Sequence, residues 1–186
     1  MITTLLIAAS SLTADKCAFQ MKCNQGKSPV VVEFKSVASD CTEDDMQIAV
    51  TAYGKSGAIA LKPAWYSPIV HMLKTKTDCT DGEEAVAGFF LNETQLLIFI
   101  TESGRPNYDN VVAALVDVKE RTLVDHVDLG KSKETLIPIL KTANGFKLRI
   151  VRDMIPDVQC DCSAAFTDDW MEVVVKKGKL TTTWMK

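Results

Sequence analysis

The chain has 186 residues, of which 47% are hydrophobic and 24% are charged, and its formal net charge is -3. This composition excludes intrinsic disorder, because it supplies enough apolar side chains for a hydrophobic core. The negative balance disfavours a nucleic-acid partner, because phosphate binding needs a clustered surface of Lys and Arg.

The first predicted element is a secretory signal peptide over residues 1–14. Leu5–Ala9 is a short apolar run, small residues follow it, and Ala14 precedes the first charged residues. The alternative is a first β-strand over Ile2–Ala9, since no Lys or Arg precedes the run. No apolar stretch reaches the length of about 20 residues that spans a bilayer, so we expect no transmembrane anchor. We expect residues 15–186 to form a single β-rich domain that is periplasmic or secreted.

Six cysteines follow the predicted signal peptide, and in an exported chain an even number predicts disulfide bonds. Cys160 and Cys162 are separated by one residue, and a bond between them would strain the geometry. We therefore expect each of them to pair with another cysteine, with Cys17, Cys23 and Cys41 as candidates. The alternatives are reduced thiols or a zinc site, but the metal-ligand spacing is poor, and we expect no metal and no cofactor. The six residues are Cys17, Cys23, Cys41, Cys79, Cys160 and Cys162.

Short β-branched runs and period-2 alternation, broken by turn residues, dominate the rest of the chain. Val30–Phe34 is the first predicted strand. Residues 43–53 are ambiguous, because an N-cap threonine followed by acidic residues favours a helix. The same segment also reads as a strand, followed by a turn at 54–57 and a second strand at 58–61, and we prefer this interpretation. Lys74–Glu84 is polar and predicts a surface loop.

Four hairpins follow, and successive hairpins predict an antiparallel meander, which needs no crossover helix. We therefore predict an all-β fold that is sandwich or propeller-like and stabilised by disulfides, with apolar residues from alternate positions filling its core. Asn144-Gly145 suits a tight turn with positive φ. The predicted turns lie at residues 92–94, 119–122, 144–145 and 177–178.

The sequence contains no recognisable catalytic motif. We interpret His71, in an apolar run, and His126, in an alternating strand, as structural residues rather than general bases. Neighbouring carboxylates such as Asp168 and Asp169 could serve a glycosidase only if two of them faced each other across a sugar site. We expect no enzymatic activity, and a hydrolase that uses such carboxylates is the alternative.

Two connecting segments are the predicted partner-binding loops. Residues 102–110 include an Arg and a Tyr, types enriched at binding hot spots. Residues 154–159 are followed by Cys160, whose disulfide would hold an apolar loop in shape and lower the entropic cost of binding. The alternative for residues 102–110 is a plain hairpin loop, and the alternative for residues 154–159 is a buried connection. The candidate contact residues are Ser103, Arg105, Asn107, Tyr108, Asp109, Met154, Ile155 and Asp157.

A leader that ends near Ala14, the early Cys17, and the strand Gln95–Phe99 leading to Val111–Gly130 together form a recognisable layout. This layout resembles that of the periplasmic immunity proteins that protect bacteria from the amidase effectors of type VI secretion. The resemblance implies a small exported β protein that blocks a cell-wall-degrading effector by plugging its cleft with a loop. It is a pattern of hairpins, so no functional residue is carried over from the family.

Two functions from different classes follow from this sequence. The first is an exported, immunity-like inhibitor that binds a protein partner and blocks it by loop insertion. The second is a structural or ligand-binding module of the cell envelope without enzymatic activity.

Overall fold

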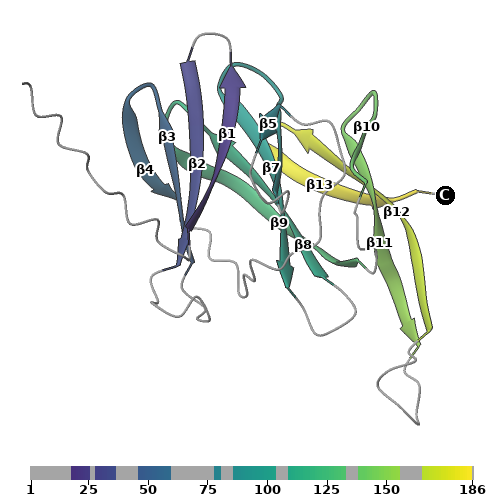
Figure 1. Cartoon of the computed structure of the whole chain (residues 1–186). Helices are drawn as coiled ribbons and strands as arrows, with labels where there is room; N and C mark the ends of the chain where they lie inside the picture. Colours follow the sequence, from purple (N-terminus) through teal and green to yellow (C-terminus); the bar gives the residue numbers. More distant parts are fainter. Residues whose placement is uncertain are drawn as a thin grey trace, which may run out of the picture.

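Turn-forming residues divide the chain into thirteen strands, which form three antiparallel sheets in the part of the chain that the structure describes (Figure 1). The predicted all-β fold is confirmed. The same part holds no helix that is long and apolar enough to cross a membrane. The structure is a computed structural model, and it describes residues 18–25, 28–36, 46–59, 78–80, 86–103, 109–132, 138–155 and 165–185.

Sheet A has the strand order β4-β3-β2-β1-β5. Residues 46–52 form strand β3, so the strand interpretation of this segment is confirmed and the helix is wrong. The turn that follows lies at Tyr53 and Gly54 rather than at 54–57, because both have positive φ angles, 54° and 73°, as in a type I′ hairpin. The strands of sheet A are β1 (Ala18–Gln25), β2 (Ser28–Ser36), β3 (Met46–Ala52), β4 (Lys55–Ile59) and β5 (Cys79–Thr80).

Sheet B is a meander of four strands in the order β6-β7-β8-β9. Both predicted hairpin turns are present, and the second ends at Arg121 because Thr122 begins β9. Asn92 holds the first turn, because its Oδ1 accepts hydrogen bonds from Thr94 N and Gln95 N, each 2.9 Å long. In the second turn Asp117 Oδ1 accepts hydrogen bonds from Lys119 N and Glu120 N. The strands of sheet B are β6 (Val86–Phe90), β7 (Gln95–Ser103), β8 (Asp109–Asp117) and β9 (Thr122–Ser132).

Sheet C repeats this arrangement in the order β10-β11-β12-β13. The turn at Lys177-Gly178 has two positive φ angles, as a type I′ turn requires. The turn at Asn144-Gly145 is also present, but neither residue has positive φ; glycine is needed there because a Cβ would collide with Val173 O. The strands are β10 (Leu140–Lys141), β11 (Phe146–Ile155), β12 (Ala165–Lys176) and β13 (Lys179–Trp184).

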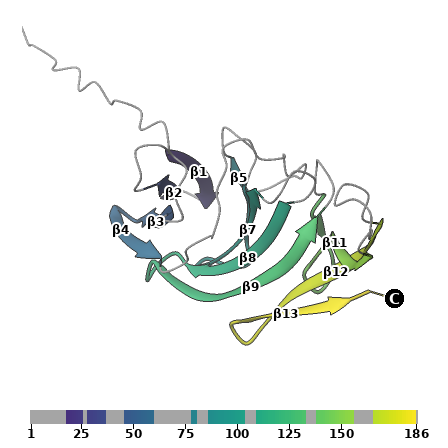
Figure 2. The ribbon, with the colours of Figure 1, turned by 90° about the horizontal axis from the view of Figure 1, so that it is seen from below.

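Sheet B lies between the other two sheets, so the molecule has three β layers (Figure 2). Leu96, Ile98 and Ile100 of β7 pack against sheet A, whereas Leu97 and Phe99 of the same strand pack against sheet C. Both faces of β7 are therefore buried over Leu96–Ile100, and this stretch is an unbroken apolar run. The expectation that alternate positions fill the core is wrong for this strand, because alternation belongs to sheets with one solvated face.

Three phenylalanine rings join the central sheet to sheet C. Phe89 and Phe99 come from β6 and β7, and Phe146 opens β11; the ring centroids lie 4.6 to 6.0 Å apart, within the range of favourable aromatic pairs. All three side chains are buried. The cluster fixes the stacking of the two sheets through contacts that no single hairpin contains.

A disulfide links Cys23 of β1 to Cys79 of β5, which are paired residues on neighbouring strands. This bond confirms disulfide stabilisation and corrects two expectations. Cys23 does not pair with Cys160 or Cys162, and Cys79 is a buried strand residue within the segment predicted as a surface loop. Neither described cysteine is free for zinc. The remaining cysteines, Cys17, Cys41, Cys160 and Cys162, lie outside the described residues, as does the predicted signal peptide.

Candidate functional site

The described residues of the first predicted contact loop are strand residues of the central sheet. Ser103 is the last residue of β7 and Asp109 is the first of β8, and the two are paired in register. They are therefore backbone-paired strand ends rather than free loop residues. Arg105, Asn107 and Tyr108 lie outside the described residues.

The first two residues of the second predicted contact loop lie in a strand. Met154 and Ile155 belong to β11, where they pair with Phe166 and Ala165 of β12, so their assignment to a loop is wrong. The described strand pairing includes Ile155. Asp157 lies outside the described residues.

The strand ends that flank the two loops lie at the same end of the stacked sheets. In Figure 1 the arrowheads of β7 and β11 both lie at the lower end, whereas the tight turns after β6, β8 and β10 lie at the upper end. The topology therefore brings the attachment points of both predicted contact loops to one end of the molecule.

The outer face of sheet C carries a group of charged and aromatic side chains. Phe146, Leu148 and Ile150 of β11 point into the core, so the residues between them point outward. The cross-strand register places Arg149 opposite Trp170. We define the sheet C outer face as Lys147, Arg149, Val151, Asp168, Trp170 and Glu172.

Trp170 lies at the centre of this face and is half-buried. The Nζ atom of Lys147 lies 5.0 Å from the centroid of its ring, within range for a cation–π interaction. Arg149 Nη2 forms an ion pair of 3.0 Å with Asp168 Oδ2. The cations beside the indole ring are thus held by neighbours that belong to the same two strands.

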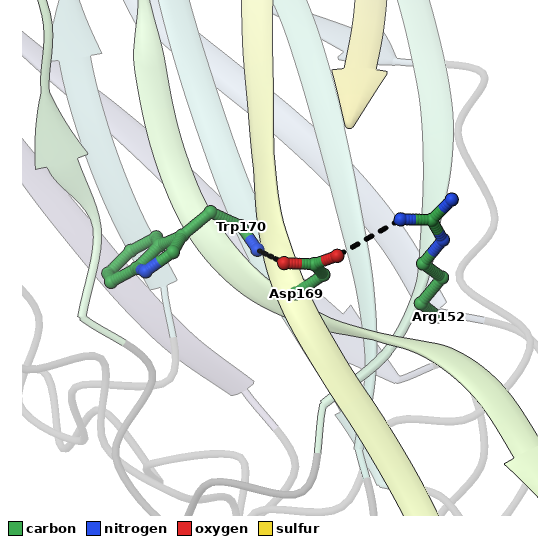
Figure 3. A network of polar contacts seen from close by, with 3 residues as sticks. All are labelled: Arg152, Asp169 and Trp170. Atoms are coloured by element: carbon green, nitrogen blue, oxygen red, sulfur yellow. Dashed lines mark hydrogen bonds and ion pairs between the residues drawn. The ribbon is translucent and has the colours of Figure 1, made fainter. Parts of the chain in front are cut away.

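A second ion pair lies on the opposite side of β12, at the rim of the interface between sheets B and C. Arg152 Nη1 lies 3.1 Å from Asp169 Oδ2, and the guanidinium also lies 5.7 Å from the centroid of Trp184. Figure 3 shows that the carboxylate of Asp169 and the ring of Trp170 extend to opposite sides of the strand, while Trp170 N donates to Asp169 Oδ1. The register shifts between Val151 and Asp153, and this β-bulge directs the side chain of Arg152.

The candidate acid and base residues that the structure describes do not form a facing pair. Asp168 and Asp169 lie on opposite faces of β12, and each is paired with a different arginine. His126 is an exposed residue of β9, as expected, and His71 lies outside the described residues. Among the described side chains, no group of three or more His, Cys, Asp or Glu residues could hold a metal ion.

Sequence reasoning missed the sheet C outer face, although a signal for it was present. In the run Asp168-Asp169-Trp170-Met171-Glu172, the tryptophan shares its strand parity with two carboxylates. Such alternation places an aromatic ring on the solvent side of a sheet with one buried face.

Comparison with known proteins gives no match of any kind: no family model, no curated protein and no solved structure matches this chain.

Proposed function

We propose that this chain is an exported inhibitor that binds a protein partner and has no catalytic activity of its own. The single observation that carries the proposal is the position of Trp170, half-buried at the centre of an outward sheet face with Arg149 directly opposite it. Tryptophan and arginine are the residue types that most often dominate the energy of protein–protein contacts.

The rigidity of this face supports a binding role. Ladder pairing holds the backbones of Lys147, Arg149 and Trp170. Lys147 also contacts the Trp170 ring and Arg149 is ion-paired with Asp168, so few rotamers are lost when a partner docks. Binding groups presented by regular strands lose less entropy on association than groups on free loops.

The two predicted contact loops extend the proposed surface. β11 runs from the sheet C outer face to Ile155, and residues 156–164 follow it. β7 of the neighbouring sheet ends at Ser103, at the same end of the stack (Figure 1), and residues 104–108 follow it. We propose that these loops enter the cleft of a partner enzyme, a cell-wall-degrading effector, while the sheet C outer face binds beside the cleft.

Export to the periplasm or the medium is part of the proposal. A disulfide such as Cys23–Cys79 forms and persists in oxidising compartments and is rare in the cytosol. The predicted signal peptide over residues 1–14 provides the route.

Affinity capture tests the proposed function. The immobilised wild-type protein is exposed to an extract of the organism that encodes it, beside the variants Trp170→Ala and Arg149→Ala. Lys22→Ala and Lys55→Ala serve as matched controls, because both lysines are exposed on sheet A, across the central sheet from the face under test.

We expect the wild type and both lysine variants to retain one protein, and Trp170→Ala and Arg149→Ala to lose most of it. Capture of the same protein by all five forms would contradict a role for the sheet C outer face. Retention of a glycan or lipid, with no protein, would favour a ligand-binding module of the envelope.

A further inference from the structure

Most sheet edges in the described structure are protected against pairing with another chain. β5 and β10 have two residues each. The pairing of β9 with β8 shifts register twice, between Val111 and Val112 and between Leu115 and Val116 of β8. Asp78 covers the edge of β6: its N–H donates to Gly88 O and its Oδ2 accepts from Phe90 N, both over 2.9 Å. Short strands, bulges and covering groups are the usual ways of blocking an exposed edge.

β13 is the edge strand of sheet C, and its hydrogen-bonding groups alternate in direction. Met185 N donates to Trp170 O, so the odd-numbered residues of this segment bond to β12. Leu180, Thr182 and Trp184 therefore direct their backbone N–H and C=O groups away from the sheet. Leu180 N is capped by Asp125 Oδ2 at 2.8 Å. No described strand pairs with Thr182 or Trp184 on this side.

The composition of this edge favours strand pairing. Leu180–Met185 contains three consecutive threonines and a tryptophan, which have high β propensity, and no charged residue, proline or glycine. Apart from the capped amide of Leu180, the devices that blunt the other edges are absent from these six residues. An open, uncharged edge of this kind is a template for another strand.

We propose that β13 binds a second copy of this chain, antiparallel to itself, about a two-fold axis at Thr183. With this register Thr182 of each copy lies opposite Trp184 of the other, and each such pair exchanges two hydrogen bonds. The four bonds use only the outward groups of Thr182 and Trp184. The bond between Asp125 and Leu180 is kept, because the pairing does not need the amide of Leu180.

The side chains are compatible with this pairing. Thr183 lies opposite Thr183 of the second copy, and Thr182 lies opposite Trp184; threonine pairs and aromatic–β-branched pairs are favourable across strands. The two sheets C join into one sheet of eight strands. The ring of Trp170 stays on the outer face of that sheet, so the dimer is independent of the proposed inhibitor function.

Sedimentation velocity over a range of concentrations tests the dimer with the full chain and three variants. Thr182→Pro removes one outward N–H from each copy and no bond within sheet C, and proline is tolerated on edge strands. Thr183→Lys brings two like charges face to face on the two-fold axis. Thr181→Lys is the matched control, since residue 181 lies opposite Met185 and the lysines do not meet.

We expect the wild type and Thr181→Lys to form a concentration-dependent dimer, and Thr182→Pro and Thr183→Lys to weaken it by about tenfold or more. Hydrogen exchange of the Thr182 and Trp184 amides should slow on dimerisation, while melting temperatures show that every variant is folded. A monomeric wild type at its highest soluble concentration would overturn the proposal. So would a dimer that Thr182→Pro and Thr183→Lys leave unchanged.

Discussion

Asp125 in β9 accepts a hydrogen bond of 2.8 Å from the backbone amide of Leu180 in β13, 55 residues further along the chain. The bond joins the edge of the central sheet to the edge of sheet C, whose faces already pack against each other. A carboxylate at this point satisfies a backbone donor that β12 does not reach, because the donor points out of the sheet.

Replacing Asp125 with alanine should lower the free energy of unfolding by about 1–3 kcal/mol, because the partly buried N–H of Leu180 loses its acceptor. Asp125→Asn should retain most of the stability, since an amide oxygen also accepts. Urea denaturation of the three forms measures the difference. Equal losses for both variants would show that charge, and not the hydrogen bond, matters here.

Removing the disulfide in a Cys23→Ala/Cys79→Ala variant should lower the free energy of unfolding by roughly 4 kcal/mol, the chain-entropy value for the loop that it closes. Cys23 and Cys79 are 56 residues apart in the sequence, so removal of the bond gives the unfolded chain much more conformational freedom. Calorimetry of both proteins measures the change in melting temperature. An unchanged melting curve would mean that the bond does not constrain the unfolded state.

Gly88 in β6 packs against the disulfide, and a Cβ at this position would collide with the Sγ atom of Cys79. Gly88→Ala should therefore destabilise the protein by about 1–3 kcal/mol, the usual cost of overpacking. The same substitution in the Cys23→Ala/Cys79→Ala background should cost much less, because the sulfur has been removed. A double-mutant cycle measures this coupling, and additive effects would refute the contact.

Buried positions of the central sheet should be far less tolerant of truncation than exposed strand positions. Phe99→Ala removes a fully buried ring from the phenylalanine cluster and should cost about 3–5 kcal/mol. Val124→Ala and Leu140→Ala are matched controls, because both side chains are more than 40% exposed; each should cost less than about 1 kcal/mol. Similar losses at all three sites would argue against burial of both faces of β7.

The hairpins could be predicted from the sequence because their signals are local. Asn92 and Asp117 each bond to backbone amides two and three residues away, so the turn and its cause lie in the same short segment. β5 could not be predicted in this way. It has two residues, and its place in sheet A is set by pairing with Cys23, far earlier in the chain.

The pattern that indicates the three-layer stack is present in the sequence but was not recognised. Leu96–Ile100 and Val111–Val116 are unbroken apolar runs, and such runs indicate strands that are covered on both faces. Which sheet covers which face depends on contacts between distant segments, such as those of Phe99 with Phe146.

The candidate site was predicted in part. The sequence identified two connections, and the structure brings their flanking strand ends to one end of the stack (Figure 1). The boundary of the second was wrong, because the bulge at Arg152 lets β11 continue to Ile155. Trp170 was missed because the role proposed for it depends on Arg149 and Lys147 of the neighbouring strand, whose register the sequence does not specify.

Isothermal titration calorimetry of the captured partner with the wild type, Trp170→Ala and Lys22→Ala tests the central claim most directly. We predict a 1:1 complex whose affinity falls at least about 30-fold for Trp170→Ala, the loss of about 2 kcal/mol that defines a hot spot, and is unchanged for Lys22→Ala. Equal affinities for all three proteins would contradict the account.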